Sequence, residues 1–242
     1  MNTMSESRVE SSATVQPQRQ VLVWDVPVRV FHWLMVLCFA GAYLTSESER
    51  LRLLHVTLGY TMAGLVVFRL LWGLVGTRYA RFTNFVRGPA AAAGYVKSML
   101  HGRPQHYTGH NPAGAIAIVA LLALALFVTT SGWATYNEIA GDWLEEVHEA
   151  AAATMLAIVG VHVAGVVVGS LMHRENLVRA MFSGRKQGTA SEGIRSAWRT
   201  VGALMIAAVL GFWYLQWNNA PAADSTDQRP VLSQQSAGHD DD

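Results

Sequence analysis

The sequence predicts an all-α, polytopic membrane protein, built as a four-helix bundle with a fifth transmembrane helix near the C-terminus. The first observation is composition, because 51% of the 242 residues are hydrophobic and only 14% are charged. Soluble domains carry about 25% charged residues. The second observation is clustering, since several apolar runs exceed the roughly 18 residues that indicate a membrane span. The third is the placement of basic residues, which alternates from loop to loop.

Five apolar runs predict the helices. We expect them over residues 28–45, 54–75, 112–136, 144–172 and 197–217. The third begins at Pro112, a residue well suited to the first turn of a helix. Residues 1–20 lack the apolar core of a secretory signal peptide. The last residues of the chain are polar and end in three aspartates, which predicts disorder.

These runs divide the chain into four expected segments. The segments are a polar N-terminal stretch (1–20), a four-helix membrane domain (21–187), a linker with the fifth helix (188–217), and a disordered acidic tail (218–242). Cys38 is the only cysteine. An intrachain disulfide is therefore excluded, as are a four-cysteine cluster and covalent haem attachment through Cys-x-x-Cys-His.

Lysine and arginine predict the orientation. The loop 77–111 and the linker 173–195 each contain five of them, and we expect both on the cytoplasmic side. The opposite side receives three arginines, Arg50, Arg52 and Arg229. The N-terminus is then expected in the cytoplasm and the C-terminal tail on the opposite side of the membrane. Tryptophans near the expected helix ends predict an interfacial belt. They are Trp24, Trp33, Trp72, Trp133, Trp143, Trp213 and Trp217.

Four of the nine histidines lie inside the expected helices or at their edges: His32, His55, His148 and His162. Ionisable residues in membrane spans are costly and usually functional. A neutral imidazole is also a good axial ligand for haem iron. These histidines are therefore the candidate metal ligands, and no catalytic acid–base group is evident beside them.

Depth sorts the four histidines into pairs. His148 and His162 are 14 residues apart on one helix, which corresponds to roughly 21 Å along the axis and nearly the same face. His55 begins its helix at the level of His148, whereas His32 lies at the level of His162. We therefore expect two haems b, an outer one between His55 and His148 and an inner one between His32 and His162.

Two arginines are expected to bind the propionates of the inner haem. Arg69 lies 14 residues after His55, on the same helical face, and Arg29 lies three residues before His32. A buried arginine requires an anionic partner. The alternative for Arg29 is snorkelling at the membrane edge. Alanines and glycines around the two histidines of the fourth helix leave room for a macrocycle, although such residues also serve helix packing.

The sequence indicates less about the roles of the other five histidines. His101, His106 and His110 lie in the loop before the third helix and are expected to be mostly solvated. His110 is nearest to the helix and is positioned to line a quinone or propionate pocket. His173 and His239 have no assigned role.

Several strings resemble the bacterial cytochrome b561 family, which also includes the cytochrome b subunits of nickel-iron hydrogenases. They are VWDVPVRVFHW (23–33), LHVTLGY (54–60), FRLLWGLVG (68–76), GHNPAG (109–114), HE (148–149) and VHVAGV (161–166). The resemblance covers roughly residues 20–187. It implies a four-helix core with two haems b held by histidine pairs, working with quinone or a redox partner. The fifth helix lies outside the resemblance.

The favoured function is electron transfer between the quinone pool and a partner protein, either a c-type cytochrome or a dehydrogenase or hydrogenase subunit. The alternative is a self-contained oxidoreductase that reduces quinone with superoxide, or that reduces ferric iron. Whether the chain is an enzyme by itself stays open between these two. A transporter or scaffold leaves the paired histidines unexplained. The lipid bilayer and quinone are further expected partners, and nucleic acid is not expected to bind.

Overall fold

The computed structural model describes residues 19–102 and 105–220. Residues 221–242 of the predicted disordered tail, which include His239, and most of the polar N-terminal stretch lie outside these residues. The first residue of that predicted tail, Asn218, is instead the last residue of a helix. Five helices are long and apolar enough to cross a membrane. They are α1 (Val26–Thr45), α2 (Arg52–Val75), α5 (Pro112–Tyr136), α6 (Trp143–His173) and α8 (Arg199–Asn218). The prediction of an all-α protein with five membrane helices is confirmed.

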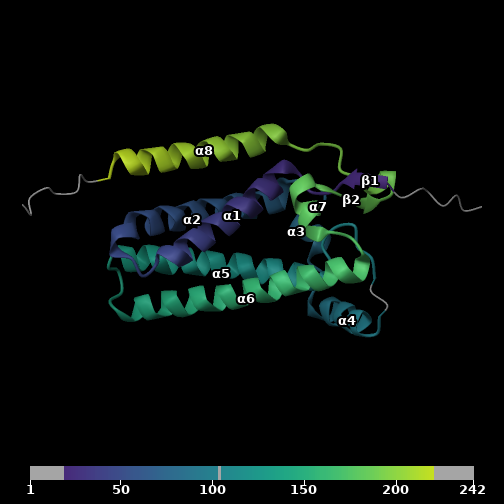
Figure 1. Ribbon diagram of the computed structural model, residues 1–242, viewed down its shortest axis with the longest axis horizontal. Helices are drawn as coiled ribbons and strands as arrows, with labels where there is room; N and C mark the ends of the chain where they lie inside the picture. Colours follow the sequence, from purple (N-terminus) through teal and green to yellow (C-terminus); the bar gives the residue numbers. More distant parts are fainter. Residues whose placement is uncertain (1–18, 103–104, 221–242) are drawn as a thin grey trace, which may run out of the picture.

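The helices α1, α2, α5 and α6 form an elongated bundle, and α8 lies along its α1 side (Figure 1). The closest pairings are α1 with α2 and α5 with α6, and α2 joins the two pairs by packing on α5. A buried apolar cluster fills the contact between the four helices. Its largest members are Phe39, Leu58, Met62, Val66, Val128 and Met155. Packing of this kind replaces the hydrophobic driving force that lipid does not supply between helices.

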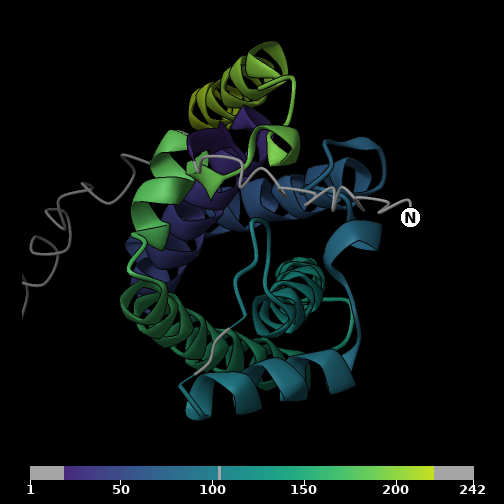
Figure 2. The same ribbon diagram turned by 90° about the vertical axis from the view of Figure 1, so that its right-hand side faces the viewer.

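Short elements gather at one end of the bundle, seen end-on in Figure 2. The loop between α2 and α5 contains α3 (Phe82–Phe85) and α4 (Pro89–Leu100). The region after α6 contains α7 (Leu177–Ser183), β2 (Arg185–Gly188) and the 3-10 turn Ala190–Glu192. A second 3-10 turn, Glu49–Leu51, precedes α2 at the other end. The sequence prediction left these segments as loop and linker because they are short and mixed in polarity.

A two-stranded antiparallel sheet closes this end. Strand β1 (Arg19–Leu22) pairs with β2 so that Arg19 faces Gly188 and Leu22 faces Arg185. The backbone N–H groups of Val23 and Trp24 then donate to the carbonyl of Gly184 at 2.8 and 3.0 Å. Residues from the two ends of the predicted membrane domain are therefore held together immediately before α1 begins.

Asp25 links the start of α1 to the end of α2. Its side chain is 0% exposed and caps α1 by accepting from the Val28 N–H at 2.8 Å. The other carboxylate oxygen accepts from Trp72 Nε1 at 3.0 Å and Thr77 Oγ1 at 2.6 Å. A buried carboxylate is tolerated when its oxygens are satisfied in this way. Trp72 and Trp24 are 9% and 7% exposed, so the prediction that these two belong to the interfacial belt is wrong. Trp24 is covered by a separate apolar cluster with Val21 and Val23.

Helix α8 is attached to the bundle by close approach and by one hydrogen bond. At Gly202 an added Cβ would lie 2.5 Å from Val26 Cγ1, so the two helices meet there at a distance that only glycine permits. Further along, Trp213 Nε1 donates to Thr61 Oγ1 of α2 at 2.8 Å. Small residues and interhelical polar contacts are the usual means of helix association in membranes. The predicted fifth helix is therefore packed against α1 and α2.

A buried cation holds the loop before α5 against β2. Lys186 is 5% exposed, donates to the carbonyl of Tyr107 at 3.0 Å and lies 3.6 Å from a Glu175 oxygen. Burial lowers the pKa of Lys186, while the charge of Glu175 acts in the opposite direction. The pair thus ties three segments together at the end where the short elements gather.

Candidate functional site

His55 and His148 lie next to each other in the bundle. His55 lies in the first turns of α2 and His148 in the first turns of α6. Their ring centroids are 6.3 Å apart and the ring planes are nearly perpendicular, at 80°. The two imidazoles come from different helices and are 93 residues apart in the chain (148 − 55).

Each ring of this pair is oriented by a backbone carbonyl. His55 Nδ1 lies 2.8 Å from the oxygen of Ala42, and His148 Nδ1 lies 3.0 Å from the oxygen of Val128. A carbonyl accepts only, so each Nδ1 carries the proton and each Nε2 keeps its lone pair. Such a bond to the remote ring nitrogen is the usual way in which a ligating histidine is positioned. The rings are therefore prepared to ligate through Nε2.

The spacing suits a metal ion between the rings. A metal–imidazole bond is about 2 Å long and the ring centre lies roughly 1 Å beyond the bonded nitrogen, so two rings on one ion stand about 6 Å apart. No group of three or more His, Cys, Asp or Glu side chains within residues 19–102 and 105–220 is arranged to hold a metal ion. Two axial nitrogens without further protein ligands fit an iron whose other ligands belong to a porphyrin.

The second pair is arranged differently. His32 on α1 and His162 on α6 are both partly buried. The His32 ring packs edge-on against Trp33, with centroids 5.0 Å apart. Its Nδ1 is buried and has no hydrogen-bond partner among the described residues. No backbone carbonyl therefore sets its tautomer in the way seen for His55 and His148.

Unpaired donors concentrate at this end of the bundle. In the described part of the chain six buried side-chain nitrogen or oxygen atoms lack a hydrogen-bond partner, and five of them are nitrogens at the end where α1 begins. They are Arg29 Nε, His32 Nδ1, Trp33 Nε1, Arg69 Nη1 and His110 Nδ1. Leaving a buried donor unsatisfied costs about 1–3 kcal/mol each. The arrangement therefore fits a bound group that carries anionic acceptors, as the two propionates of haem do.

Arg69 is the most buried of the predicted arginines, at 3% exposure. Its guanidinium carbon lies 4.8 Å from the centre of the Phe82 ring, on the short helix α3. It is not within 4.0 Å of a carboxylate among the described residues, although Asp25 contributes a favourable charge from further away. A guanidinium remains charged in proteins, so this residue retains capacity for an anion.

Arg29 is less constrained than Arg69. It is partly buried, and its Nη1 donates weakly to the carbonyl of Ser183 at 3.5 Å. The remaining Nε is one of the unpaired atoms. Both arginines predicted for the inner haem therefore lie at the end that contains His32, and each has a free donor.

The three histidines of the loop before α5 differ in their exposure to solvent. His101 and His106 are exposed, as expected, and His106 lies at 4.0 Å from Glu175. His110 instead packs between Trp24 and Phe85, with centroid distances of 4.4 and 4.6 Å. Burial, reinforced by the positive charge of Arg69, lowers the pKa of His110 to about 3, so its ring is neutral. The expectation that His110 is mostly solvated is wrong, because the aromatic residues that cover it come from distant segments.

Two further residues at the His148 ring were not predicted. Ser131 Oγ lies 3.2 Å from His148 Nδ1, beside the Val128 carbonyl. At Gly132 an added Cβ would lie 2.8 Å from His148 Cε1, so this position must stay free of a side chain. A serine and a glycine in an apolar helix carry no distinctive sequence signal. Only the packing of α5 on α6 identifies them.

Comparison with known proteins identifies the family of the chain. A sequence model of the family described as prokaryotic cytochrome b561 matches residues 23–184. The chain belongs to this family. The family consists of b-type cytochromes, so haem b is the implied cofactor and the chain is a multi-pass membrane cytochrome. The matched region ends before α8, in keeping with the earlier observation that the fifth helix lies outside the resemblance.

The curated relatives carry the names of hydrogenase subunits. The chain is 24% identical over 216 residues to the "Probable Ni/Fe-hydrogenase B-type cytochrome subunit" of Rhizobium leguminosarum bv. viciae, covering 70% of this chain and 90% of that protein. It is 29% identical over 143 residues to the "Probable Ni/Fe-hydrogenase 1 B-type cytochrome subunit" of Escherichia coli K12, covering 48% of this chain and 60% of that protein. No solved structure matches the chain.

Proposed function

We propose that this cytochrome holds two haems b and transfers electrons between the quinone pool and a redox partner protein. The observation that carries the proposal is the pair His55 and His148, with ring centroids 6.3 Å apart and both Nδ1 atoms engaged by carbonyls. Haem b supplies a one-electron Fe(III)/Fe(II) couple when it is bound between two imidazoles. The histidines set the depth of each site, and α6 contributes one ligand to each pair.

The inner site rests on a second set of contacts. His32 and His162 supply the axial nitrogens, while Arg69 and Arg29 direct free donors to the propionates. Their positive charges offset the negative charge of the propionates in a medium of low dielectric constant. The residues of the chain therefore bind and orient the group, and they contribute no acid–base catalyst.

The partner is inferred from the relatives and from the expected topology. Relatives named as hydrogenase cytochrome subunits favour a hydrogenase as the electron donor. Basic residues in 77–111 and 173–195 favour a cytoplasmic N-terminus and a periplasmic C-terminus in a bacterial inner membrane. A c-type cytochrome or another dehydrogenase fits the same haem arrangement, and quinone is the proposed membrane-soluble reactant.

Two measurements test the proposal. Pyridine haemochrome analysis of the purified full chain should give about two haems b per polypeptide, and a count of one or none contradicts the four-histidine scheme. Quinol added without a partner should reduce the haem. Sustained turnover should require either an oxidised c-type cytochrome that accepts electrons from quinol, or a hydrogenase with hydrogen that supplies electrons to quinone. Turnover of superoxide with quinone, or of quinol with ferric iron, in the absence of any partner protein would instead support the self-contained oxidoreductase.

A further inference from the structure

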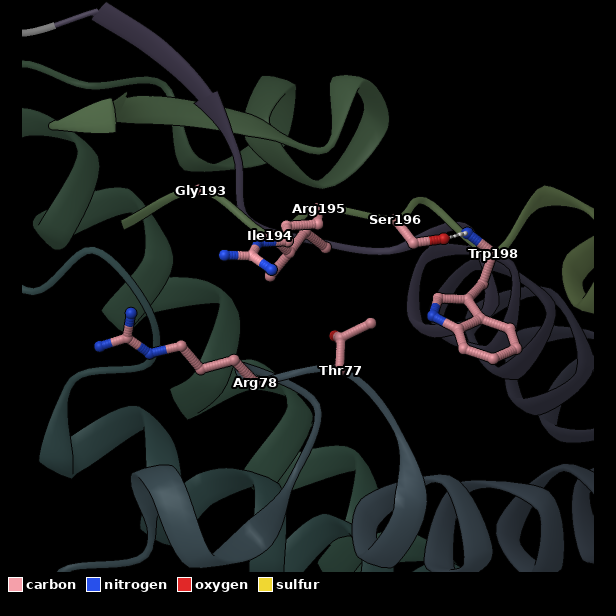
Figure 3. Close-up of a pocket in the computed structure, with 7 residues that line it drawn as sticks. All are labelled: Thr77, Arg78, Gly193, Ile194, Arg195, Ser196 and Trp198. Carbon is pink, nitrogen blue, oxygen red and sulfur yellow. Dashed lines mark hydrogen bonds between the residues drawn. The ribbon is translucent and has the colours of Figure 1, made fainter. Parts of the chain in front are cut away.

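A basic cavity lies where α1 and α8 begin and α2 ends, outside the haem sites. It has a volume of about 280 Å³. Its lining comes from the turn after α2 and from the strand-like segment before α8, as drawn in Figure 3. The lining residues are Thr77, Arg78, Gly193, Ile194, Arg195, Ser196 and Trp198. None of the residues proposed to bind haem lines this cavity.

Two arginines give the cavity its charge. Arg78 and Arg195 come from opposite walls, and their guanidinium groups extend toward the same side in Figure 3. Neither is within 4.0 Å of a carboxylate in residues 19–102 and 105–220. A second hollow of about 360 Å³ shares Arg195 and adds Arg19 to its lining. The surface thus presents three guanidinium groups without anionic partners in the described part of the chain.

The nearest acidic side chains are already engaged. Asp25 lies behind Thr77, is 0% exposed and receives hydrogen bonds on both oxygens. Glu192, next to the lining residue Gly193, accepts from Thr108 and Thr189, and the Thr108 bond is the main reason that its pKa is lowered. Neither carboxylate is free to neutralise the arginines of the cavity.

The position of the cavity identifies the kind of anion. Trp198 lines the cavity, is 48% exposed and precedes the membrane helix α8, a location typical of the interface between headgroups and acyl chains. It provides no side-chain cap for α8, so the first amides of that helix add to the positive field. Phosphate groups of lipids occupy this depth, and guanidinium groups bind phosphate oxygens in a bidentate manner.

We propose that this cavity binds the phosphodiester headgroup of an anionic phospholipid from the surrounding bilayer. Arg78 and Arg195 bind the phosphate, and Arg19 extends the positive surface toward the polar end of the headgroup. Trp198 lies at the boundary between the headgroup and the acyl chains. Basic pockets at the ends of transmembrane helices are known to select anionic lipids. A bound lipid would also bridge α2 and α8 at their junction.

The test uses the haem-loaded full chain in a non-ionic detergent, with lipid adducts counted by native mass spectrometry. Phosphatidylglycerol should bind at one site more tightly than phosphatidylcholine. The double variant Arg78→Gln with Arg195→Gln should bind phosphatidylglycerol about 30-fold more weakly, from the contribution of each basic residue at a membrane surface. The matched control is Arg174→Gln with Arg179→Gln, which removes the same charge from the same end of the bundle but outside the cavity.

The outcomes separate the possible sources of the anion. Retention of lipid by the double variant, or equal loss in the control, overturns the proposal. Displacement of the lipid by inorganic phosphate at millimolar concentration would assign the site to a soluble anion and overturn the lipid source. Haem content reports folding of each variant. If the double variant loses haem, the single variants carry the test, since each should bind phosphatidylglycerol roughly fivefold more weakly.

Discussion

The two histidine pairs of this cytochrome differ in the hydrogen bonds made by their Nδ1 atoms. At the outer end, His55 and His148 are each oriented by a backbone carbonyl before any cofactor is considered. At the inner end, Nδ1 of His32 and nitrogens of Arg29 and Arg69 have no hydrogen-bond partner in the part of the chain that the structure describes. The first pair is oriented by helix packing, whereas the second lies among buried nitrogens that could bind an anionic group.

This difference has a physical consequence for cofactor retention. In the proposed outer site, the carbonyls of Ala42 and Val128 belong to packed helices, so we expect the rings to keep their orientation with or without haem. The inner end without haem buries donors that cost about 1–3 kcal/mol each when unsatisfied. We therefore expect the inner haem to contribute more to stability than the outer haem, and the variants below test this asymmetry.

The largest effect is expected from the axial histidines. His148→Ala and His55→Ala should each remove the outer haem, while His32→Ala and His162→Ala should each remove the inner one. Haem content should fall from about two to about one per chain, because an iron that has lost an imidazole is no longer held between two helices. Redox titration of the remaining haem identifies which site survives. Loss of the same haem in His55→Ala and His162→Ala would show that the pairing by depth is wrong.

Arg69→Leu should act on the inner haem alone. Removing one partner of a buried charge pair typically costs about 3–5 kcal/mol, so part of the inner haem should be lost. The midpoint potential of the retained haem should fall, since a nearby positive charge favours the added electron. Arg69→Lys should be milder, because lysine keeps the charge without the bidentate fork. Spectroelectrochemical titration measures both variants, and an unchanged inner potential in Arg69→Leu argues against a contact with the propionates.

Gly132→Ala should disturb the outer site with an intermediate effect. The new Cβ would lie 2.8 Å from His148 Cε1, which forces the ring or the helix to move. Overpacking of this kind costs about 1–3 kcal/mol, so the outer haem should dissociate faster while the inner haem titrates as before. Gly211→Ala on α8 is the matched control, because an added Cβ there meets nothing within 4 Å. Equal haem loss in both variants would mean that helix stability, not the His148 ring, is responsible.

Ser131→Ala should have the smallest effect on the orientation of the His148 ring. It removes the 3.2 Å contact to His148 Nδ1 but leaves the Val128 carbonyl in place. A single hydrogen bond contributes about 1 kcal/mol, so outer haem affinity should fall severalfold with a small change in potential. Transfer of haem to an apo-globin acceptor measures the rate. An effect as large as that of Gly132→Ala would show that the serine, and not the carbonyl, is the principal anchor.

The features that could be predicted before the structure depend on local composition and helical period. The five spans follow from apolar runs, Pro112 marks the first residue of α5, and the 14-residue spacing of His148 and His162 follows from the geometry of one helix. The tertiary structure decided which distant groups meet. It brings the ring centroids of His55 and His148 to 6.3 Å. It also places the backbone carbonyl of Ala42 against His55, a contact that the identity of the alanine does not predict. It encloses His110 between aromatic rings. It also forms the basic cavity from segments more than a hundred residues apart. Such contacts arise from the packing of whole helices, and no local pattern of residues encodes them.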